Sequence, residues 1–327
     1  MEYRLLYGVI ATLLVLFELV YFRLADHFNI IDKPNQRSSH KRVTLRGGGI
    51  IFPISMLIQA VFFGVSYLWF LVGLISICTI SFIDDIRSVS NSIRLAIQFV
   101  SILLLFYQWG ILVSDSWWIV IVSVIFCTGI INAYNFMDGI NGITGGYSLI
   151  VLLSLAIVNA RMPFVEQSLI ISAILGVLVF CFFNFRTKAK CFAGDVGSIG
   201  ISFIIIFLLG QLIIQTGDLW YIVFLSVYGV DSILTIIHRI ILKENIGQAH
   251  RKHAYQLMAN ELHISHVRVS AIYMIIQAVV SAGIIWLPIN GWLYLSIVLA
   301  VLCVTYALFI TKYYHLHTEY LKTLKQS

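Results

Sequence analysis

The chain has 327 residues, of which 60% are hydrophobic and only 11% are charged. Soluble globular domains carry about 25% charged residues, so the composition excludes an ordinary soluble domain and predicts an integral membrane protein. The formal net charge is +6, and the five cysteines have neither metal-site spacing nor the pattern of a disulfide framework.

Long apolar runs recur along the whole chain. A membrane-spanning helix needs about 20 apolar residues, whereas a membrane β-barrel would show alternating segments of about ten residues, which this chain lacks. The predicted fold class is therefore all-α, a polytopic bundle of about eleven transmembrane helices, or ten if the second and third runs form one element. The predicted spans are 3–22, 48–65, 67–83, 93–113, 117–136, 143–160, 165–185, 197–215, 219–242, 269–287 and 292–311.

Two runs need separate comment. The first is too long for the core of a signal peptide and no cleavage site follows it, so we expect it to be retained. The stretch 47–83 would form a straight helix about 55 Å long, so we expect a turn near Gly64-Val65-Ser66-Tyr67. We interpret 1–327 as one domain, with a motif-bearing core at about 32–256 and a short cytoplasmic tail at 312–327.

The positive charges orient the bundle. If the N-terminus lies outside, only Arg4 and Arg161 of the 21 basic residues fall on the outer side. Cytoplasmic loops carry an excess of Lys and Arg, so the loops that hold the other 19 are predicted to face the cytoplasm. The surplus of positive charge then reflects topology, and it does not indicate nucleic-acid binding.

Four aspartates stand where apolar runs stop, all on the predicted cytoplasmic side. They are Asp84 and Asp85 in SFIDDIRS, Asp138 in NAYNFMDGING and Asp195 in FAGDVGSIG. Adjacent carboxylates repel each other unless Mg²⁺ or a basic side chain screens them. The alternative for Asp84 and Asp85 is a helix-end pair that faces water.

Amides and glycines surround two of these aspartates. Asn132, Asn135 and Asp138 recur at intervals of three residues, so we expect them near one face at the end of the fifth span. A polar turn would account for the glycines that follow but not for asparagines inside a span, which need partners or a cavity. Asp195 precedes a predicted helix, so it is either an N-cap or, as the flanking glycines and Phe192 favour, part of a ligand site.

Two basic segments lie on the same side. Arginine and histidine at high density suit a diphosphate, and the alternatives are a positive-inside loop and general membrane-surface charge. A zinc site lacks a third histidine or a cysteine nearby. The segments are AHRKHAYQ, with His250, Arg251, Lys252 and His253, and PNQRSSHKRVTLRGGG, with Lys41 and Arg46.

The distribution of polar residues favours an enzyme over a transporter. A transporter or flippase of lipid-linked or anionic solutes needs polar groups near the midplane of the membrane, and Asp231 in the ninth span is the main candidate. We interpret Asp231 as structural support that faces the bundle interior and a basic partner. The outer loops are short and nearly featureless, which counts against transport, and the presence of all the motif acids counts against an inactive scaffold.

Taken together, these motifs resemble those of a known enzyme family. DD at a span end, NxxNxxDGIxG, GDxGS and a late HRxHxYQ loop occur in this order between about residues 32 and 256. They resemble the polyprenyl-phosphate N-acetylhexosamine-1-phosphate transferases of glycosyltransferase family 4. The resemblance implies transfer of HexNAc-1-phosphate from a UDP-sugar to undecaprenyl phosphate in a bacterial inner membrane, with release of UMP, to initiate O-antigen, capsule or cell-wall polymer synthesis.

The resemblance also implies roles for single residues. Asn135 and Asp195 would bind Mg²⁺, for which Mn²⁺ could substitute, and Asp84, Asp85 and Asp138 would form or support the reactive centre. Direct attack by the lipid phosphate, a dianion at pH 7, is favoured over a covalent carboxyl-phosphate intermediate. Whether the chain forms a homodimer is left open. The residues expected to bind substrate are Asn132, Asn141, Phe192, His250, Arg251, His253, Lys41 and Arg46, with Phe192 and Asn141 near the uracil.

The chain departs from the family pattern at two places. Bacterial members usually read DGIDG where this chain reads DGING, so Asn141 can pair with uracil but cannot act as a base. The loop reads HRKH where the peptidoglycan translocase has three consecutive histidines, which argues against a MurNAc-pentapeptide donor. The expected donor sugar is GlcNAc or a 6-deoxy HexNAc such as QuiNAc or FucNAc.

Overall fold

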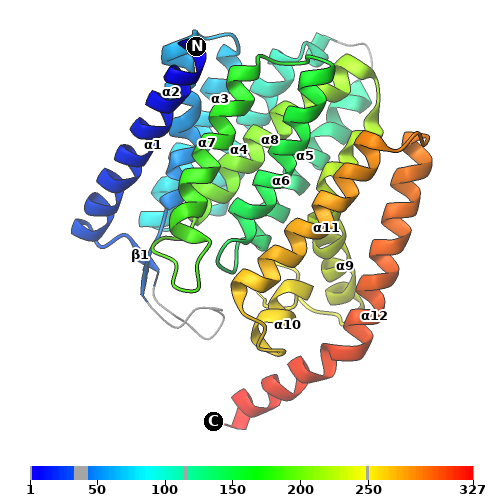
Figure 1. Ribbon diagram of the computed structural model, residues 1–327. Helices are drawn as coiled ribbons and strands as arrows, with labels where there is room; N and C mark the ends of the chain where they lie inside the picture. Colours follow the sequence, from blue (N-terminus) through cyan, green and yellow to red (C-terminus); the bar gives the residue numbers. More distant parts are fainter. Residues whose placement is uncertain (1, 33–42, 114–116, 248–249, 327) are drawn as a thin grey trace.

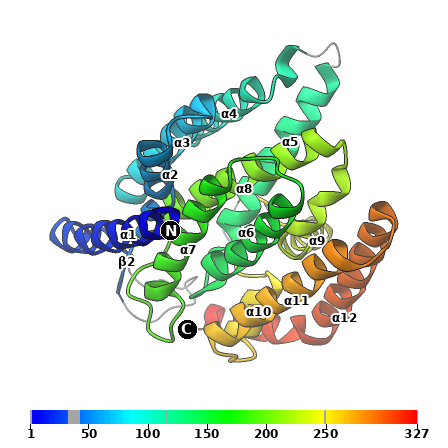
Figure 2. The same ribbon diagram turned by 45° about the horizontal axis from the view of Figure 1, so that its top comes forward.

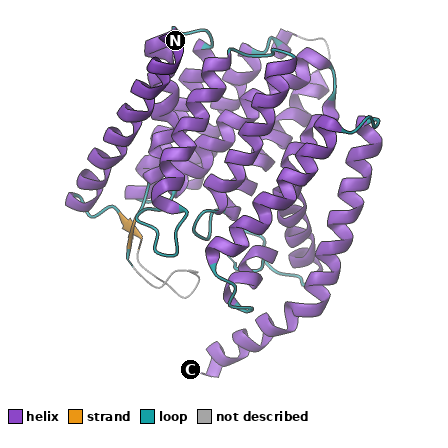
Figure 3. Ribbon diagram, in the orientation of Figure 1, coloured by secondary structure: helices purple, strands orange, loops and turns teal. Residues whose placement is uncertain are grey.

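The computed structural model describes residues 2–32, 43–113, 117–247 and 250–326, which form a helical bundle with one short pair of strands (Figures 1 and 3). The α-helices are α1 (Glu2–His27), α2 (Ile51–Phe63), α3 (Leu68–Ile86), α4 (Asn91–Gln108), α5 (Trp117–Met137), α6 (Ile143–Arg161), α7 (Gln167–Asn184), α8 (Gly194–Thr216), α9 (Ser226–Ile241), α10 (Ala254–Asn260), α11 (His266–Trp286) and α12 (Gly291–Gln326). The 3-10 helices are η1 (Gly48–Ile50), η2 (Ile111–Val113) and η3 (Leu219–Leu225), and the strands are β1 (Ile31–Asp32) and β2 (Thr44–Leu45).

The expected membrane-spanning elements are present. Ten of the described helical segments are long and apolar enough to cross a membrane, and Gly48–Phe63 forms a shorter apolar helix. Each predicted span therefore corresponds to a helix, and the chain is a polytopic, all-α membrane protein. The turn expected between the second and third spans is confirmed, because α2 ends at Phe63, Gly64 has a φ of 91°, and α3 begins at Leu68.

Successive long helices alternate in direction, so alternate connections gather at the same end of the bundle (Figure 1). One end, which we call the loop end, carries β1, β2, α10 and the connections 87–90, 138–142, 185–193 and 242–265. The opposite end carries short connections such as 64–67 and 217–218. All four motif aspartates and the HRKH segment therefore lie at the loop end.

Helix α8 lies in the middle of the bundle (Figure 2) and packs against α2, α3, α5 and α6. A helix that is apolar on all sides is stable only when it is buried on all sides, and the α8 residues Ile204 and Leu208 are fully buried. The Phe70 ring of α3 stacks on Phe207 of α8 with ring centroids 4.2 Å apart. The bundle thus holds the N-terminus of α8, and with it Asp195, at the centre of the loop end.

The predicted tail at the C-terminal end of the chain is helical. Its described residues, 312–326, continue α12, which has 36 residues. A helix of this length extends about 54 Å, which exceeds the roughly 30 Å of a bilayer core. Its end therefore projects beyond the loop end and passes beneath α10 (Figure 1).

Candidate functional site

Two connecting segments run side by side at the loop end. The backbone N–H of Phe192 donates to the carbonyl of Leu45 at 2.8 Å, and the N–H of Gly48 donates to the carbonyl of Phe192 at 2.9 Å. The segments approach so closely that a Cβ added at Gly49 would lie 2.2 Å from Gly197 Cα, so only glycine fits there. This pairing carries Arg46, which follows β2, to the start of α8.

An alternating network of acids and arginines joins three helices at this point. Arg94 Nη1 lies 2.9 Å from Asp84 Oδ2, and Arg94 Nη2 lies 3.2 Å from Asp195 Oδ2. Arg46 Nη2 lies 3.5 Å from Asp195 Oδ1, and Arg46 Nε lies 2.6 Å from Asp85 Oδ1. We call Asp84, Arg94, Asp195, Arg46 and Asp85 the ion-pair network. Asp195 is its centre, because both arginines contact it.

The two adjacent aspartates have different surroundings. The side chain of Asp85 is fully buried, and its oxygens accept the backbone N–H groups of Asp195 at 2.9 Å and Val196 at 3.0 Å. These are unpaired donors at the N-terminus of α8, so Asp85 caps that helix from another element. Asp84 accepts the N–H of Val89 at 2.7 Å, and its side chain is 11% exposed. Asp84 is therefore the more accessible member of the pair.

Asn135 contacts the centre of the network. Its Nδ2 donates to Asp195 Oδ1 at 3.1 Å and to Ser198 Oγ at 3.2 Å. Its amide oxygen accepts no hydrogen bond from the part of the chain that the structure describes. The two residues expected to bind a metal are thus adjacent.

The expectation that Asn132, Asn135 and Asp138 share one face is wrong. Asn132 lines an apolar pocket beside α9 and α12, and Asp138 lies beyond the end of α5, where it accepts a hydrogen bond from Thr144 Oγ1 at 2.7 Å. Three residues turn a helix through about 300°, so each member of such a series is rotated by about 60° from the one before. The helix also ends at Met137, one residue before Asp138.

The environment of Asp138 favours its neutral form. Burial raises the pKa of Asp138 to about 7, the hydrogen bond from Thr144 opposes this rise, and the negative charges of Asp195 and Asp85 add to it. At neutral pH this carboxyl group is therefore divided between its protonated and ionised forms. That property suits a group that supports the site by hydrogen bonding.

The two residues expected near uracil are associated with different parts of the α7–α8 connection: Asn141 contacts its beginning, and Phe192 lies near its end. Asn141 is 6% exposed, and its Nδ2 donates to the carbonyl of Arg186 at 2.8 Å and weakly to that of Thr187 at 3.4 Å. Its amide therefore fixes the connection that leads to Asp195. Phe192 is partly exposed beside β2. Contact of either residue with a nucleotide stays a prediction.

The histidines of the HRKH segment face α5. The ring centroids of His250 and His253 each lie 6.4 Å from that of Phe136. His253 Nδ1 lies 3.4 Å from Asp231 Oδ1, while the hydroxyl of Tyr273 donates to Asp231 Oδ2 at 2.5 Å. The expectation that Asp231 faces the interior and a basic partner is confirmed.

His250 is a neutral imidazole in this setting. Burial lowers the pKa of His250 to about 3, and the neighbouring charges of His253, Arg239 and Lys252 lower it further. Its Nδ1 is buried without a hydrogen-bond partner among the described residues. His250 can therefore offer a ligand a hydrogen bond at neutral pH, but not a positive charge.

Two expected residues are not seen in the ion-pair network, and one residue of the network was not expected. Lys41 lies outside the described residues, and Arg251 contacts Glu261 and Tyr320 rather than the ion-pair network. The sequence interpretation missed Arg94 as a site residue. A signal for it exists, because a cation in the first turn of a helix is disfavoured by the helix dipole unless an acid pairs with it.

The residues present fit a divalent cation shared with a substrate, but not a closed protein cage. Within the described ranges, no group of three or more His, Cys, Asp and Glu side chains has the arrangement of a metal site. Mg²⁺ is usually bound by one or two carboxylates, together with waters and substrate phosphates. Asp195 and the amide oxygen of Asn135 match that requirement.

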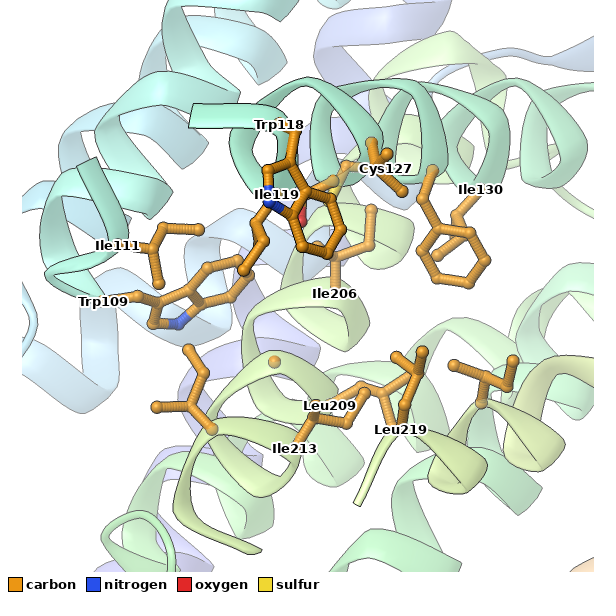
Figure 4. A pocket seen from close by; sticks show the side chains of 16 residues that line it. Trp109, Ile111, Trp118, Ile119, Cys127, Ile130, Ile206, Leu209, Ile213 and Leu219 are labelled. Carbon is orange, nitrogen blue, oxygen red and sulfur yellow. The ribbon is translucent and has the colours of Figure 1, made fainter. Parts of the chain in front are cut away.

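Two apolar pockets flank α5. One, of about 410 Å³, lies between α5, α8 and η3, and Trp109 and Trp118 stand at one side of it (Figure 4). The other, of about 510 Å³, lies between α5, α9 and α12 and includes Asn132 and Phe136. Phe126, Ile130 and Ile222 line both pockets. A long apolar chain could therefore follow α5 from the opposite end of the bundle to the histidines at the loop end.

Comparison with known proteins agrees with this geometry. The family model described as Glycosyl transferase family 4 matches residues 67–213, which include Asp84, Asn135 and Asp195. The chain is also 29% identical over 299 residues to the probable undecaprenyl-phosphate N-acetylglucosaminyl 1-phosphate transferase of Bacillus subtilis, which covers 82% of each chain. The chain is therefore similar to glycosyl transferase family 4 over its central region.

Two further relatives have related names. The undecaprenyl-phosphate alpha-N-acetylglucosaminyl 1-phosphate transferase of Thermotoga maritima is 26% identical over 73% of this chain and 76% of its own length. The phospho-N-acetylmuramoyl-pentapeptide-transferase of Petrotoga mobilis is 27% identical over 50% of this chain and 59% of its own length. The family resemblance expected from the motifs is therefore confirmed.

Proposed function

We propose that the protein transfers an N-acetylhexosamine-1-phosphate group from a UDP-sugar to undecaprenyl phosphate and releases UMP. The main support for this proposal is that residues from three separate segments of the sequence contact Asp195. Asp85, Asn135 and Arg46 come from different elements, and each contacts Asp195 directly. The loop end then faces the cytoplasm of a bacterial cell, in the inner membrane, where UDP-sugars are available.

The transfer itself requires a single displacement. A terminal oxygen of the lipid phosphate attacks the β-phosphorus of the UDP-sugar, and the bond from that phosphorus to the bridging oxygen breaks as UMP leaves. The attacking phosphate is mostly a dianion at pH 7, so no strong base is needed. Phosphoryl transfer depends mainly on positioning of the two substrates and on stabilisation of the negative charge on the phosphoryl group. The positive charges of Arg46 and Arg94 would serve both purposes.

Asp195 and Asn135 would hold Mg²⁺ in the proposed site. When bound, this cation would neutralise part of the phosphate charge. Asp195 is held in place by Asp85 through the N-terminus of α8, and Asp138 supports the connection to α6 through Thr144. His250, as a neutral imidazole, would offer hydrogen bonds to the donor.

The two apolar pockets along α5 provide a place for the isoprenoid chain of the acceptor. Their linings are almost entirely apolar side chains, and the second pocket ends at Phe136, next to His250 and His253. The isoprenoid would exchange lipid contacts for protein contacts here, so van der Waals packing against the pocket walls would hold it. The phosphate end of the acceptor would then lie near Phe136, at the loop end of α5.

The proposed donor sugar is GlcNAc or a 6-deoxy HexNAc. The HRKH segment lacks three consecutive histidines, and two relatives of similar length are named as N-acetylglucosaminyl 1-phosphate transferases. The product would initiate synthesis of a lipid-linked surface glycan.

A panel of UDP-sugars tests the proposal. Purified protein is incubated with undecaprenyl phosphate and each UDP-HexNAc, and released UMP is measured with and without Mg²⁺, Mn²⁺ and a chelator. We expect UMP release with at least one donor, loss of release with the chelator, and recovery with added Mg²⁺. Absence of UMP with every UDP-HexNAc would refute the proposed reaction, and a phosphorylated aspartate trapped without acceptor would refute direct attack.

A further inference from the structure

The four residues of the HRKH segment divide between two directions. His250 and His253 face Phe136 on α5, with ring centroids 6.4 Å away. Arg251 and Lys252 face α12 instead. The Arg251 guanidinium lies 4.6 Å from the centroid of the Tyr320 ring, and Lys252 Nζ lies 5.7 Å from that of Tyr314. The segment is therefore held between α12 and Phe136, which lines the pocket between α5, α9 and α12.

The contacts on α12 come from three neighbouring rings of its projecting end. The ring centroids of Tyr314 and His317 lie 5.8 Å apart, and those of His317 and Tyr320 lie 6.3 Å apart. His317 Nδ1 lies 2.8 Å from Glu261 Oε1, just beyond the end of α10. Arg251 Nη1 donates weakly to the hydroxyl of Tyr320, and Arg251 Nη2 lies 3.4 Å from Glu261 Oε1. We call Tyr314, His317 and Tyr320 the α12 brace.

The centre of the brace is closed to solvent, although Tyr314 and Tyr320 are partly exposed. His317 is 1% exposed, and the side chain of Glu261 is 5% exposed. Lys252 also forms an ion pair with Glu244 at the end of α9. Buried ion pairs add little net stability but fix a specific geometry when all their partners are present. The contacts of the brace with Arg251, Lys252 and Glu261 can therefore fix the position of the HRKH segment.

We propose that the α12 brace positions His250 and His253 for binding of the donor's sugar diphosphate. The effect on donor binding rests on the proposed function. The ordering of the HRKH segment by the brace does not depend on it. His250 and His253 would contact the donor, whereas Tyr314, His317 and Tyr320 act only through Arg251, Lys252 and Glu261. The brace makes no contact with the ion-pair network in the described chain, so chemistry at Asp195 should proceed normally once the donor is bound.

The test compares a brace variant with a matched control on the same helix. The brace variant carries His317→Ala and Tyr320→Ala, and the control carries His315→Ala and Glu319→Ala, two exposed positions of α12. We expect the brace variant to raise KM for the UDP-sugar about tenfold, because it removes a hydrogen bond and a cation–π contact, with kcat within about twofold of wild type. Tyr320→Phe keeps the aromatic ring that contacts Arg251. When phenylalanine replaces alanine at position 320, most of the rise in KM for the UDP-sugar should disappear.

Hydrogen exchange provides a readout that does not depend on activity. The amides of α10, residues 254–260, should exchange faster in the brace variant than in wild type, and exchange in α8 should be unchanged. If α10 exchange and KM both stay at wild-type values, or if kcat falls while KM does not change, the proposal is wrong. If wild-type protein releases no UMP with any donor, the proposed function fails, and the α10 exchange still decides whether the brace orders the loop.

Discussion

The carboxylate of Asp85 accepts the backbone N–H of Asp195 at 2.9 Å, so one acid of the site holds in place the helix end that carries another. Asp85 is fully buried and also pairs with Arg46. The adjacent Asp84 is partly exposed and pairs with Arg94. The sequence presents the two residues as equivalent, but one is buried and positions a helix end, and the other is accessible to solvent.

Substitution of the two aspartates should separate stability from activity. Asp85→Asn leaves Arg46 without its buried partner, and loss of one member of a buried ion pair costs about 3–5 kcal/mol. Asp84→Asn removes only a partly exposed pair, so its effect on stability should be below about 1 kcal/mol, while UMP release should fall sharply. Thermal unfolding in detergent and initial rates check both expectations. Equal losses of stability in the two variants would contradict this assignment.

Asp195→Asn should abolish turnover and leave the protein folded. Even loss of a residue that only orients a metal ligand costs about 10- to 100-fold in metal affinity or activity, so loss of the proposed ligand itself should cost at least about 100-fold. Asp26→Asn, an exposed acid at the end of α1, is the control and should leave the rate unchanged. Retained activity in Asp195→Asn with normal Mg²⁺ dependence would show that the metal is bound elsewhere.

Two glycines at opposite ends of α8 offer a matched pair. Gly194 and Gly217 have φ values of 71° and 74°, so alanine costs about 1–2 kcal/mol of backbone strain at either position. At Gly194 the added Cβ would also lie 2.5 Å from Asp85 Oδ2, whereas at Gly217 it meets nothing within 4 Å. We expect only Gly194→Ala to lose UMP release, although both lower the unfolding temperature. Similar activity in the two variants would argue against a close-packed site around Asp85.

Asp138 should make stability fall as the pH rises from about 4 to about 7. Its pKa is about 7 in the folded protein against 3.8 for an unperturbed group, so the folded state holds more protons in this interval and loses stability as they dissociate. Each unit of difference in pKa between the folded and unfolded states changes the free energy of unfolding by about 1.4 kcal/mol. Asp138→Asn should therefore be more stable than wild type at pH 8 and equal to it near pH 4. Parallel unfolding profiles of the two proteins across this range would contradict the raised pKa.

The pocket between α5, α9 and α12 can be filled without disturbing its walls. A Cβ at Gly129 meets nothing within 4 Å, and Gly129 lines the pocket. Gly129→Phe should raise KM for undecaprenyl phosphate about tenfold or more, should affect a short-chain polyprenyl phosphate much less, and should leave KM for the UDP-sugar unchanged. Gly129→Ala is the control, because it replaces the glycine without filling the pocket, and it should leave KM for undecaprenyl phosphate unchanged. An unchanged KM for the long acceptor in Gly129→Phe would place the isoprenoid elsewhere.

Hydropathy alone was sufficient to find the membrane spans, because each must satisfy its own backbone within lipid. The turn at Gly64 followed from length, and the grouping of Asp195 with Asn135 followed from the family resemblance. The pairing of Arg94 with Asp195 could not be predicted, because it depends on how α4 approaches α8. The direction of Arg251 depends on the end of α12, which lies about 70 residues away in sequence and has no membrane pattern of its own.

The alternation of charge in the ion-pair network would couple the binding of the proposed metal to that of the proposed donor. Asp195 pairs with both Arg46 and Arg94, so these side chains serve as one another's counter-ions. A cation bound at Asp195 would release the two arginines for phosphate, and a diphosphate bound at the arginines would release Asp195 for the cation. Each ligand would thus remove the competitor of the other, and thermodynamic reciprocity would make the gain in affinity the same in both directions. Such a site would bind either ligand alone weakly and the two together strongly.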